Sequence, residues 1–493
     1  MGRTMRMAEW MQTSGVTFGT SGARGLVSAM TDEVCFGYTR AFLDHLQAQG
    51  MFATHGRVAI AGDLRPSTTR MLDAVRAAVE HGAAQAVVCG RIPTPALALH
   101  GLEQGIPSVM VTGSHIPDDR NGIKFNRPDG EILKTDEAAI AQRTVELPHW
   151  FDAHGMLQAA HCPAPLPPSH LAAERYVERY CGAFAAGALT GRRVGVYGHS
   201  SVGRELLVEI LTALGADVLR LGWSERFIPV DTEAIRAEDV RLARGWAREA
   251  QLFAIVSADG DADRPLIADA QGRWLRGDIA ALLAARFVAA DTVVCPVSCN
   301  TAVEACGAFA RVARTRIGSP YVIEAMQRAL ADGGRRVVGY EANGGFLSVT
   351  PLALAAGGTL SPLPTRDAVV VCLAVLVDAA QRDISIAQLR ATLPDRFTAS
   401  DRLAGMAPER SRRLIDELTG GGAPAIQVML PMLGTVRDVN VVDGLRVTFA
   451  GGEIVHWRPS GNAPELRCYA EAATEARAEA LCRIALEGLA TRG

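Results

Sequence analysis

Short apolar runs alternate along most of the chain with longer stretches in which apolar residues recur every three or four positions. The run GRVAIAG (56–62), for example, ends in the polar segment DLRPST and leads into a helical pattern that starts at Met71. Apolar runs of this length, followed by helical spacing, predict buried strands that alternate with helices. The pattern therefore indicates an α/β protein whose mixed or parallel sheets are covered by helices.

The same order of elements occurs three times within residues 1–393. In each repeat the third apolar run ends in a polar loop: TGSH (112–115), SADGDADR (257–264) and GYEANGG (339–345). Ligands of α/β sheets collect outside the carboxyl ends of the strands. We therefore predict three similar mixed α/β domains whose equivalent loops face one central cleft.

The proline-rich segment CPAPLPPSH (162–170) predicts a hinge after the first repeat. After the third repeat the pattern changes to alternating strand segments and a closing alanine-rich helix, which is typical of an α+β domain. We expect α/β domains at 1–169, 170–277 and 278–393, the third opening with a helix at Asp278, and a C-terminal α+β domain at 394–493. The apolar run that begins at Ala368 is too short to span a membrane and predicts a buried helix.

Composition and charge narrow the class of protein further. The 493 residues are 48% hydrophobic and 21% charged, which is ordinary for a soluble globular protein. The formal net charge of −3 comes without a basic block, so nucleic acid is not an expected partner. Ten cysteines without a C-x-x-C pair favour neither a disulfide framework nor a zinc site. Because the N-terminus lacks a signal-peptide run, we expect a cytoplasmic protein with no membrane partner.

Three aspartates in the second loop indicate a metal site. Asp259, Asp261 and Asp263 are two residues apart, and in extended backbone their side chains share one face. Three like charges this close repel one another unless a cation neutralises them, and oxygen ligands suit Mg²⁺. The spacing is not that of an EF-hand, because Arg264 and Ala270 stand where glycine and glutamate are needed. The alternative is a solvated acidic turn, although the preceding run LFAIV favours a buried strand end.

The first loop carries three reactive side chains. Ser114 and His115 are adjacent, and Lys124 follows ten residues after Ser114. The G-x-S-x-G elbow of hydrolases is absent. A helix-capping serine beside an incidental histidine is the simpler alternative. Because the equivalent loop of the next repeat carries the aspartates, we favour a phosphoserine whose phosphate completes the magnesium shell.

Two further segments suit a phosphorylated sugar. RPSGNAPELR (458–467) offers an arginine fork and a glycine-containing turn of backbone amides, both suited to a phosphate dianion. GYEANGG offers Glu341 and Asn343 to sugar hydroxyls. Each segment is equally compatible with a simple turn, and Arg24 in the glycine-rich FGTSGARG is weak evidence by itself.

Together, the segments FGTSGARG, TGSHIP, DGDADR, GYEANGG and RPSGNAPELR closely resemble the motifs of the α-D-phosphohexomutase family and occur in the family's order. The resemblance implies four domains around a central cleft, three of them similar. It also implies an intramolecular phosphotransferase that interconverts hexose 6-phosphate and hexose 1-phosphate through a bound hexose 1,6-bisphosphate. Mg²⁺ is the implied metal, and hexose 1,6-bisphosphate is the implied activator. The implied partners are small-molecule hexose phosphates, bound by a monomer or homodimer.

The resemblance assigns roles to residues. Ser114 is the implied phosphoserine, with Lys124 as the general base and acid for the sugar hydroxyl. The implied metal ligands are Ser114, Asp259, Asp261 and Asp263. The side chains implied to line the reacting phosphate are Arg24, His115, Lys124 and Arg264. The residues implied to bind the substrate are Glu341, Asn343, Ser319, Arg458, Ser460, Gly461, Asn462 and Arg467.

The resemblance is incomplete in the sugar-binding segments. Asn343 stands where many members have serine, Ser319 where some have histidine, and Asn462 where threonine is usual, so the sugar contacts stay open. GYEANGG and RPSGNAPELR are most similar to members that convert mannose 6-phosphate to mannose 1-phosphate for GDP-mannose and polysaccharide synthesis. Members acting on glucose phosphates are the alternative. Outside the family, a metal-dependent sugar phosphatase would need no second phosphate clamp at Arg458. A silent sugar-phosphate-binding protein could lose Ser114.

Overall fold

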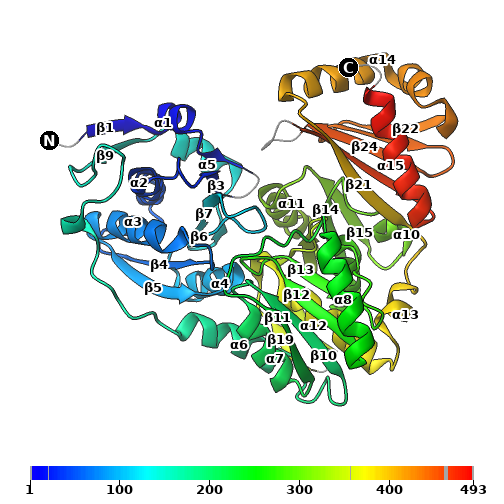
Figure 1. Cartoon of the computed structure of the whole chain (residues 1–493), viewed down its shortest axis with the longest axis horizontal. Helices are drawn as coiled ribbons and strands as arrows, with labels where there is room; N and C mark the ends of the chain where they lie inside the picture. Colours follow the sequence, from blue (N-terminus) through cyan, green and yellow to red (C-terminus); the bar gives the residue numbers. More distant parts are fainter. Residues whose placement is uncertain (1–2, 20–21, 356, 460–464, 491–493) are drawn as a thin grey trace.

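The structure is a computed structural model of the whole chain and describes residues 3–19, 22–355, 357–459 and 465–490. Four units follow one another along the chain (Figure 1). We call them the first to fourth unit and divide them at the predicted boundaries, residues 169, 277 and 393. The first unit lies on one side, the second and third lie together, and the fourth packs beside the third. Within the described ranges, no helix has the length and apolar character needed to cross a membrane. The ten cysteines are free thiols.

The first three units share one strand plan, which confirms the predicted repeat. Each sheet has three parallel strands in the order second, first, third, and an antiparallel strand beside the third. The three candidate loops all join the third strand to the antiparallel strand, so they occupy equivalent positions. In sheet order, the strands are β5 (Gln85–Arg91), β4 (Arg57–Gly62), β6 (Ser108–Val111) and β7 (Arg120–Arg127) in the first unit, β11 (Asp217–Trp223), β10 (Arg193–His199), β12 (Ala254–Ala258) and β13 (Pro265–Ala268) in the second, and β15 (Arg311–Thr315), β14 (Thr292–Pro296), β16 (Val337–Tyr340) and β17 (Phe346–Ser348) in the third.

Helices cover both faces of the first sheet. Residues of α2 and α3 pack with one set of alternating β4 side chains, and residues of α4 pack with the other set. Strand β3 extends the sheet beside β7 and carries Arg24. The further elements of this unit are β1 (Arg3–Arg6), α1 (Met7–Ser14), β2 (Thr17–Phe18), β3 (Ala23–Leu26), α2 (Asp32–Ala48), α3 (Thr68–His81), α4 (Thr94–Gln104), β8 (Gly130–Glu131), α5 (Lys134–Ala141), β9 (Thr144–Leu147) and a 3-10 turn (Ala159–His161).

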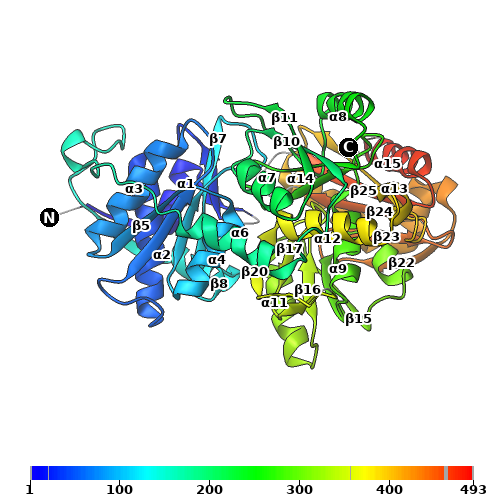
Figure 2. The same cartoon turned by 90° about the horizontal axis from the view of Figure 1, so that it is seen from below.

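One continuous apolar core joins the first three units. It includes side chains from α4, α6, α9 and α12, and Figure 2 shows α4 and α6 where the first unit meets the other two. The buried helix predicted from Ala368 is confirmed as α12, while α9 begins one residue before the predicted Asp278. The further elements are α6 (Leu171–Ala183), α7 (Arg204–Ala213), α8 (Ala237–Ala250), α9 (Gly277–Phe287), α10 (Ala302–Ala305), α11 (Ser319–Ala331), β18 (Leu352–Ala353), β19 (Thr359–Leu360), β20 (Leu363–Asp367), α12 (Ala368–Gln381) and α13 (Ile386–Arg390).

The fourth unit is an antiparallel sheet covered by helices, as predicted, and has an apolar core of its own. The sequence pattern missed its first strand and the long helix α14. The segment GGGAP inside α14 has low helix propensity, and the helix bends at Gly422, where φ is 58°. The elements are β21 (Phe397–Ala404), α14 (Pro408–Met429), a 3-10 turn (Pro431–Leu433), β22 (Val436–Asn440), β23 (Leu445–Phe449), β24 (Ile454–Pro459), β25 (Glu465–Ala472) and α15 (Glu475–Ala490).

Candidate active site

The serine loop and the aspartate loop meet at Ser114. This residue follows β6, is fully buried and adopts a left-handed backbone with a φ of 57°. Its Oγ donates a hydrogen bond to Oδ2 of Asp259 at 2.5 Å. Because Asp259 belongs to the equivalent loop of the second unit, the structure brings these two predicted loops into direct contact.

A tight turn brings the three aspartates together. The Asp259 N–H donates to the Arg264 carbonyl at 3.1 Å, and Oδ1 of Asp259 accepts the N–H groups of Asp263 at 3.1 Å and Arg264 at 3.2 Å. One oxygen from each of Asp259, Asp261 and Asp263 lies within 4.8 Å of the others. The expected extended backbone is wrong, because β12 turns back directly into β13 at this point. The expected convergence of the side chains is present.

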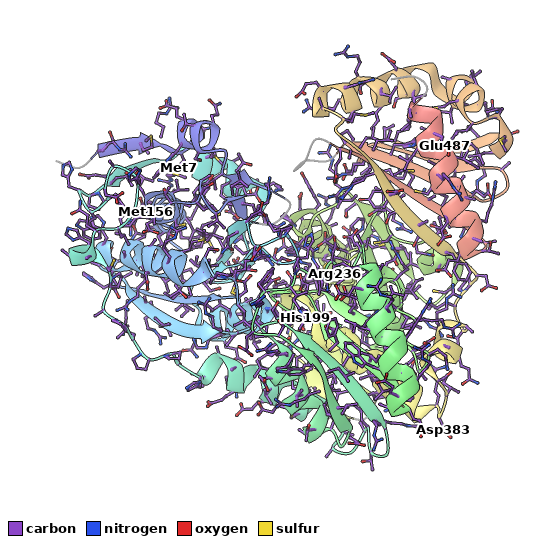
Figure 3. The ribbon with its side chains drawn as sticks, viewed as in Figure 1. Met7, Met156, His199, Arg236, Asp383 and Glu487 are labelled. Atoms are coloured by element: carbon purple, nitrogen blue, oxygen red, sulfur yellow. The ribbon has the colours of Figure 1, made fainter. Side chains whose placement is uncertain are left out.

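The second unit supports this turn from behind. Nε2 of His199, labelled in Figure 3, lies 2.7 Å from the carbonyl oxygen of Ala258, directly before Asp259. Burial lowers the pKa of His199 to about 4, so the ring is neutral and Nε2–H is the donor. The Ser201 hydroxyl donates to the Asp259 carbonyl at 2.8 Å. These contacts fix the backbone on which the aspartates stand.

The aspartate cluster fits a divalent cation. All three carboxylates are buried, and Oδ1 of Asp261 and Oδ1 of Asp263 have no hydrogen-bond partner among the described residues. Nζ of Lys124 lies 2.6 Å from Oδ2 of both residues, so one ammonium group already sits between two of the carboxylates. Buried hard-oxygen donors at this spacing fit Mg²⁺. The side chains in position to hold it are Ser114, Asp259, Asp261 and Asp263.

The carboxylates of this cluster are not equivalent. Burial, and then the charges of Asp261 and Asp263, raise the pKa of Asp259 well above its usual range. Burial alone would also raise the pKa of Asp263, but the guanidinium of Arg366 and the ammonium of Lys124 lower it below its usual range. A cation bound beside Asp259 stabilises its charged form and so opposes the effect of burial.

Cationic side chains also lie beside Ser114, and Arg264 is within 3.9 Å of Asp259 and 3.6 Å of Asp263. Nη1 of Arg264 is 2.8 Å from Nδ1 of His115, and that nitrogen is 3.4 Å from Oγ of Ser114. Burial, followed by the charges of Arg264 and Arg24, lowers the pKa of His115 well below its usual value, so the ring is neutral and Nδ1 accepts the Arg264 N–H. Burial, then Arg264 and Arg366, lowers the pKa of Arg24 to about 10. Nη2 of Arg24 has no partner among the described residues, which suits a phosphate oxygen.

Arg366, which the sequence analysis missed, connects the aspartate loop to the sugar loop. Its Nε and Nη2 donate to Oδ2 of Asp263 at 3.0 and 2.9 Å, and its Nη1 donates to Oε2 of Glu341 at 2.9 Å. Arg366 is almost fully buried at the end of β20. The one signal in the sequence is a charged Arg-Asp pair directly before the most apolar helix, which is unusual for residues that end in the interior.

The other predicted sugar-binding residues make internal contacts. Oδ1 of Asn343 accepts the N–H of Gly345 at 2.9 Å and so stabilises its own turn. The Asn343 carbonyl accepts the Thr232 hydroxyl at 3.0 Å. Ser319 is fully buried, and its hydroxyl donates to Glu131 of the first unit at 2.7 Å. Of the predicted sugar contacts in the third unit, Glu341 is the one that Arg366 links to the aspartate loop.

The fourth unit carries the predicted arginines on β24 and β25. Nε of Arg458 donates to Oδ1 of Asp443 at 2.9 Å, and Oδ2 of Asp443 accepts the N–H of Ile317 from the third unit at 2.8 Å. Nε of Arg467 donates to Glu465 at 2.9 Å. After burial and the nearer arginines, the charge of Arg467 also lowers the pKa of His115, which places Arg467 within electrostatic reach of the serine loop. Ser460, Gly461 and Asn462 lie outside the described residues.

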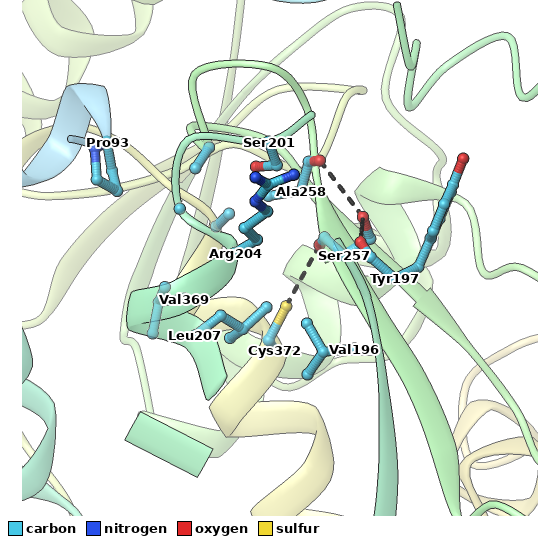
Figure 4. Close-up of a pocket in the computed structure, with 13 residues that line it drawn as sticks. Pro93, Val196, Tyr197, Ser201, Arg204, Leu207, Ser257, Ala258, Val369 and Cys372 are labelled. Atoms are coloured by element: carbon cyan, nitrogen blue, oxygen red, sulfur yellow. Dashed lines mark hydrogen bonds between the residues drawn. The ribbon is translucent and has the colours of Figure 1, made fainter. Parts of the chain in front are cut away.

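One pocket borders the aspartate loop, and another borders Lys124. The first, with about 340 Å³ of empty space, is mostly apolar and lies behind the aspartate loop, between Pro93 and Cys372 (Figure 4). Its lining arginine, Arg204, already donates to the carbonyls of His199 and Ser224, so this pocket does not suit phosphate. The second, of about 280 Å³, borders Lys124. The chemistry therefore centres on the aspartates and not on the larger pocket.

Comparison with known proteins decides the family. The chain matches sequence models described as phosphoglucomutase/phosphomannomutase alpha/beta/alpha domain I at residues 15–148, alpha/beta/alpha domain III at 276–397 and C-terminal domain at 402–487. It is 44% identical over 459 residues to the phosphomannomutase of Salmonella muenchen, covering 93% of this chain and 92% of the relative. The chain belongs to the phosphoglucomutase/phosphomannomutase family. It is also 42% identical to the phosphomannomutase of Sinorhizobium fredii, covering 93% of this chain and 95% of the relative.

Solved structures show the same fold. A phosphoglucomutase/phosphomannomutase family protein from Burkholderia thailandensis superimposes with a TM-score of 0.72 at 19% identity, covering 95% of this chain and 96% of the other. The predicted fold class, three similar α/β domains and a C-terminal α+β domain, is confirmed. Membership of this family makes the chain a phosphotransferring isomerase, as the sequence analysis expected.

Proposed function

We propose that this enzyme interconverts mannose 6-phosphate and mannose 1-phosphate, with Ser114 carrying the transferred phosphoryl group. Two relatives, 44% and 42% identical, are phosphomannomutases, which supports mannose phosphates over glucose phosphates. The observation that carries the proposed mechanism is the direct contact of Ser114 with a buried three-aspartate loop. A cation and two arginines can offset the charge of the phosphate that this hydroxyl would carry.

In the proposed transfer, the phosphoryl group moves from Oγ of Ser114 to a hydroxyl oxygen of the sugar. The P–O bond to Ser114 breaks as the P–O bond to the sugar forms. Lys124 is our candidate to accept the hydroxyl proton at Nζ, after its ammonium group has lost a proton to solvent. Arg24 and Arg264 donate N–H groups to the phosphoryl oxygens, where negative charge is spread during transfer. Mg²⁺, when held by the phosphoserine and the aspartates, stabilises the charge on the leaving serine oxygen.

The resulting hexose 1,6-bisphosphate turns around in the site and returns its other phosphoryl group to Ser114. Lys124 returns the proton to the sugar oxygen that loses its phosphate. Hexose 1,6-bisphosphate added from outside serves as the activator, because it phosphorylates Ser114 on an enzyme that has lost its phosphate. Glu341, held in place by Arg366, is our candidate for orienting the sugar hydroxyls.

A fixed anion site must hold the phosphate that is not reacting in both orientations of the sugar. We assign this clamp to the arginines of the fourth unit, Arg458 and Arg467, together with Ser460, Gly461 and Asn462. An arginine fork binds two phosphate oxygens at once. Asp443 orients the Arg458 side chain through Nε, and we assign the phosphate to the two terminal nitrogens.

Coupled assays with mannose 1-phosphate, glucose 1-phosphate and glucosamine 1-phosphate, each with a catalytic amount of glucose 1,6-bisphosphate, test the proposal. We expect the highest kcat/KM with mannose 1-phosphate and no measurable turnover by Ser114→Ala. A higher kcat/KM with glucose 1-phosphate would make the enzyme a phosphoglucomutase. Full turnover by a folded Ser114→Ala protein would refute the role of the serine.

A further inference from the structure

The carbonyl groups of the serine loop converge on one buried arginine that the proposed reaction does not use. Arg65 follows β4, and its side chain is fully buried. Nη2 donates to the carbonyl oxygens of Ser114 at 2.8 Å and Ile116 at 2.5 Å. Nη1 donates to those of Pro117 at 2.7 Å and Arg120 at 3.1 Å. One guanidinium therefore binds four carbonyl groups between Ser114 and Arg120, the first residue of β7.

Asp63 orients this arginine and also reaches the serine from the other side. Nε of Arg65 donates to Oδ2 of Asp63 at 3.1 Å, and the Thr112 hydroxyl donates to the same oxygen at 2.7 Å. The Thr112 hydroxyl oxygen in turn accepts the N–H of Ser114 at 2.8 Å. Both backbone groups of Ser114, its N–H and its carbonyl, are thus tied to the Asp63–Arg65 pair.

These contacts hold Ser114 in a backbone conformation that it would not adopt freely. A φ of 57° is unfavourable for a residue with a Cβ atom, and such strain persists only where the surroundings enforce it. The conformation directs Oγ at the aspartate loop, 2.5 Å from Asp259. The strained backbone therefore belongs to the residue whose Oγ reacts in the proposed transfer. The hydrogen bonds of Arg65 keep this backbone from relaxing to a more favourable conformation.

The space around this arginine is also restricted. A Cβ atom on Gly113 would lie 2.6 Å from Cζ of Arg65, and one on Gly260 of the aspartate loop would lie 2.6 Å from the Ser114 carbonyl oxygen. The ring of Phe227, from the second unit, lies over the guanidinium with its centroid 4.1 Å from Cζ. Arg65 thus stands between the serine loop of the first unit and an aromatic side chain of the second.

We propose that Arg65 is the positioning residue of the reaction: it fixes the backbone of Ser114 so that Oγ stays directed at the aspartate loop. The inference rests on the proposed role of Ser114 as phosphoryl carrier. Arg65 itself touches neither the substrate nor the phosphoryl group. Its loss slows the transfer to and from Ser114 and leaves sugar binding in place, because the arginines that bind the substrate belong to other segments.

The variant Arg65→Lys tests this role, since lysine keeps the charge but cannot donate to four carbonyls from a planar fork. The protein is incubated with glucose 1,6-bisphosphate and Mg²⁺, the rate of phosphate gain on Ser114 is followed by mass spectrometry, and kcat and KM are measured. We expect phosphate gain and kcat to fall about 100-fold, as for a reacting group displaced by about 1 Å, with KM within about threefold of wild type. The matched control is Arg314→Lys, because Arg314 donates to the carbonyls of Pro296, Cys299 and Asn300 in a loop of the third unit.

Gly113→Ala is a second variant that keeps the arginine. Its added methyl group displaces the guanidinium of Arg65, so we expect the same fall in kcat with an unchanged KM. This variant keeps the test possible if Arg65→Lys does not fold. Wild-type rates of phosphate gain in Gly113→Ala, or a kcat loss in Arg65→Lys no larger than in Arg314→Lys, would overturn the positioning role. Failure of the carrier proposal is distinguishable, because the wild-type protein would then gain no phosphate on Ser114.

Discussion

Lys124 contacts two of the carboxylates that are candidates to hold the metal ion. Its Nζ lies 2.6 Å from Oδ2 of both Asp261 and Asp263. An ammonium group at this position offsets the negative charge that the same two carboxylates offer to Mg²⁺, so we expect the two cations to compete. If a bound cation weakened the contacts of Nζ with the aspartates, Nζ would be free for the proton transfer to the sugar that we propose. We therefore expect metal binding and the availability of Lys124 to be linked.

We predict that Lys124→Met binds Mg²⁺ at least about tenfold more tightly than wild type, or about 1.4 kcal/mol, because a competing cation is gone. Turnover falls at the same time, since the proton-transfer group is lost. Titration calorimetry measures the affinity. Lys134→Met, which removes an ammonium paired with Glu137 at 2.7 Å, is the matched control. Unchanged or weaker Mg²⁺ binding by Lys124→Met would show that the two cations do not compete.

The residues of the site were predictable to different degrees. Ser114 and the aspartates could be found because their chemistry is concentrated in short segments at strand ends. Arg65 could not, since the carbonyl groups that it contacts lie about fifty residues further along the chain, and Arg366 had only the weak signal of a charged pair before an apolar helix. A lone arginine beside a strand gives no local signal of burial, because most arginines are exposed.

At the level of elements, equivalent loops at equivalent strand ends were predicted correctly from the repeated apolar pattern. The spacing of apolar residues distinguishes strands from helices and so gives their order along the chain. In an α/β sheet, that order determines which loops lie at the carboxyl ends of the strands. The backbone of the aspartate loop was not predictable in the same way. Its turn depends on the Asp259 side chain capping the following N–H groups, and alternating aspartates fit an extended strand equally well.

Arg366 joins two of these loops, and a double-mutant cycle tests the link. We predict that Glu341→Ala and Arg366→Met each lower kcat/KM for all hexose phosphates, because each leaves a buried partner unpaired. The expected loss of transition-state stabilisation is roughly 1–3 kcal/mol for each variant. The double variant should lose clearly less than the sum, since the two residues act as a unit. Strict additivity would show that the loops are independent. Wild-type turnover by Glu341→Ala would show that the sugar is held elsewhere.

Strand β24 carries a buried histidine that makes the fourth unit sensitive to acid. Burial lowers the pKa of His456 to about 4, and its Nδ1 has no partner among the described residues. The unfolded chain therefore binds more protons than the folded one between about pH 6.5 and pH 4, so stability falls as the pH falls through this range. We predict that the free energy of unfolding falls between pH 7 and pH 4 by about 3 kcal/mol more in the wild type than in His456→Gln. Urea unfolding of both proteins at the two pH values measures this difference. A constant difference between the two proteins across this range would contradict the buried neutral histidine.

At the level of the whole molecule, the first three units share one apolar core while the fourth has its own. The fourth unit reaches the third through polar contacts such as Arg316 to the Val442 carbonyl at 3.0 Å and Ile317 to Asp443 at 2.8 Å. Contacts of this kind hold domains less firmly than a shared core, so relative motion is the expected behaviour. The domain boundaries at 169, 277 and 393 stay a prediction, and limited proteolysis can locate them.

We predict that the fourth unit closes when substrate binds, which keeps water from the phosphoserine. Arg458→Ala should raise KM about 10- to 100-fold, the effect of losing charged hydrogen bonds to one phosphate. Phosphorylation of Ser114 and Mg²⁺ binding should stay intact. Small-angle scattering should show that substrate compacts the wild type and the control Arg477→Ala, but not Arg458→Ala. An unchanged KM in Arg458→Ala would show that Arg458 does not bind the non-reacting phosphate.

The most direct test is whether the phosphoryl group on Ser114 reaches the sugar. Enzyme labelled on Ser114 with radioactive phosphate from glucose 1,6-bisphosphate is mixed with unlabelled mannose 6-phosphate in a rapid-quench instrument. We predict that the label leaves Ser114 at a rate no slower than kcat and appears first in mannose 1,6-bisphosphate and then in a mannose monophosphate. Label that stays on the protein while mannose 1-phosphate forms, or that leaves as inorganic phosphate, would contradict a phosphoserine mutase.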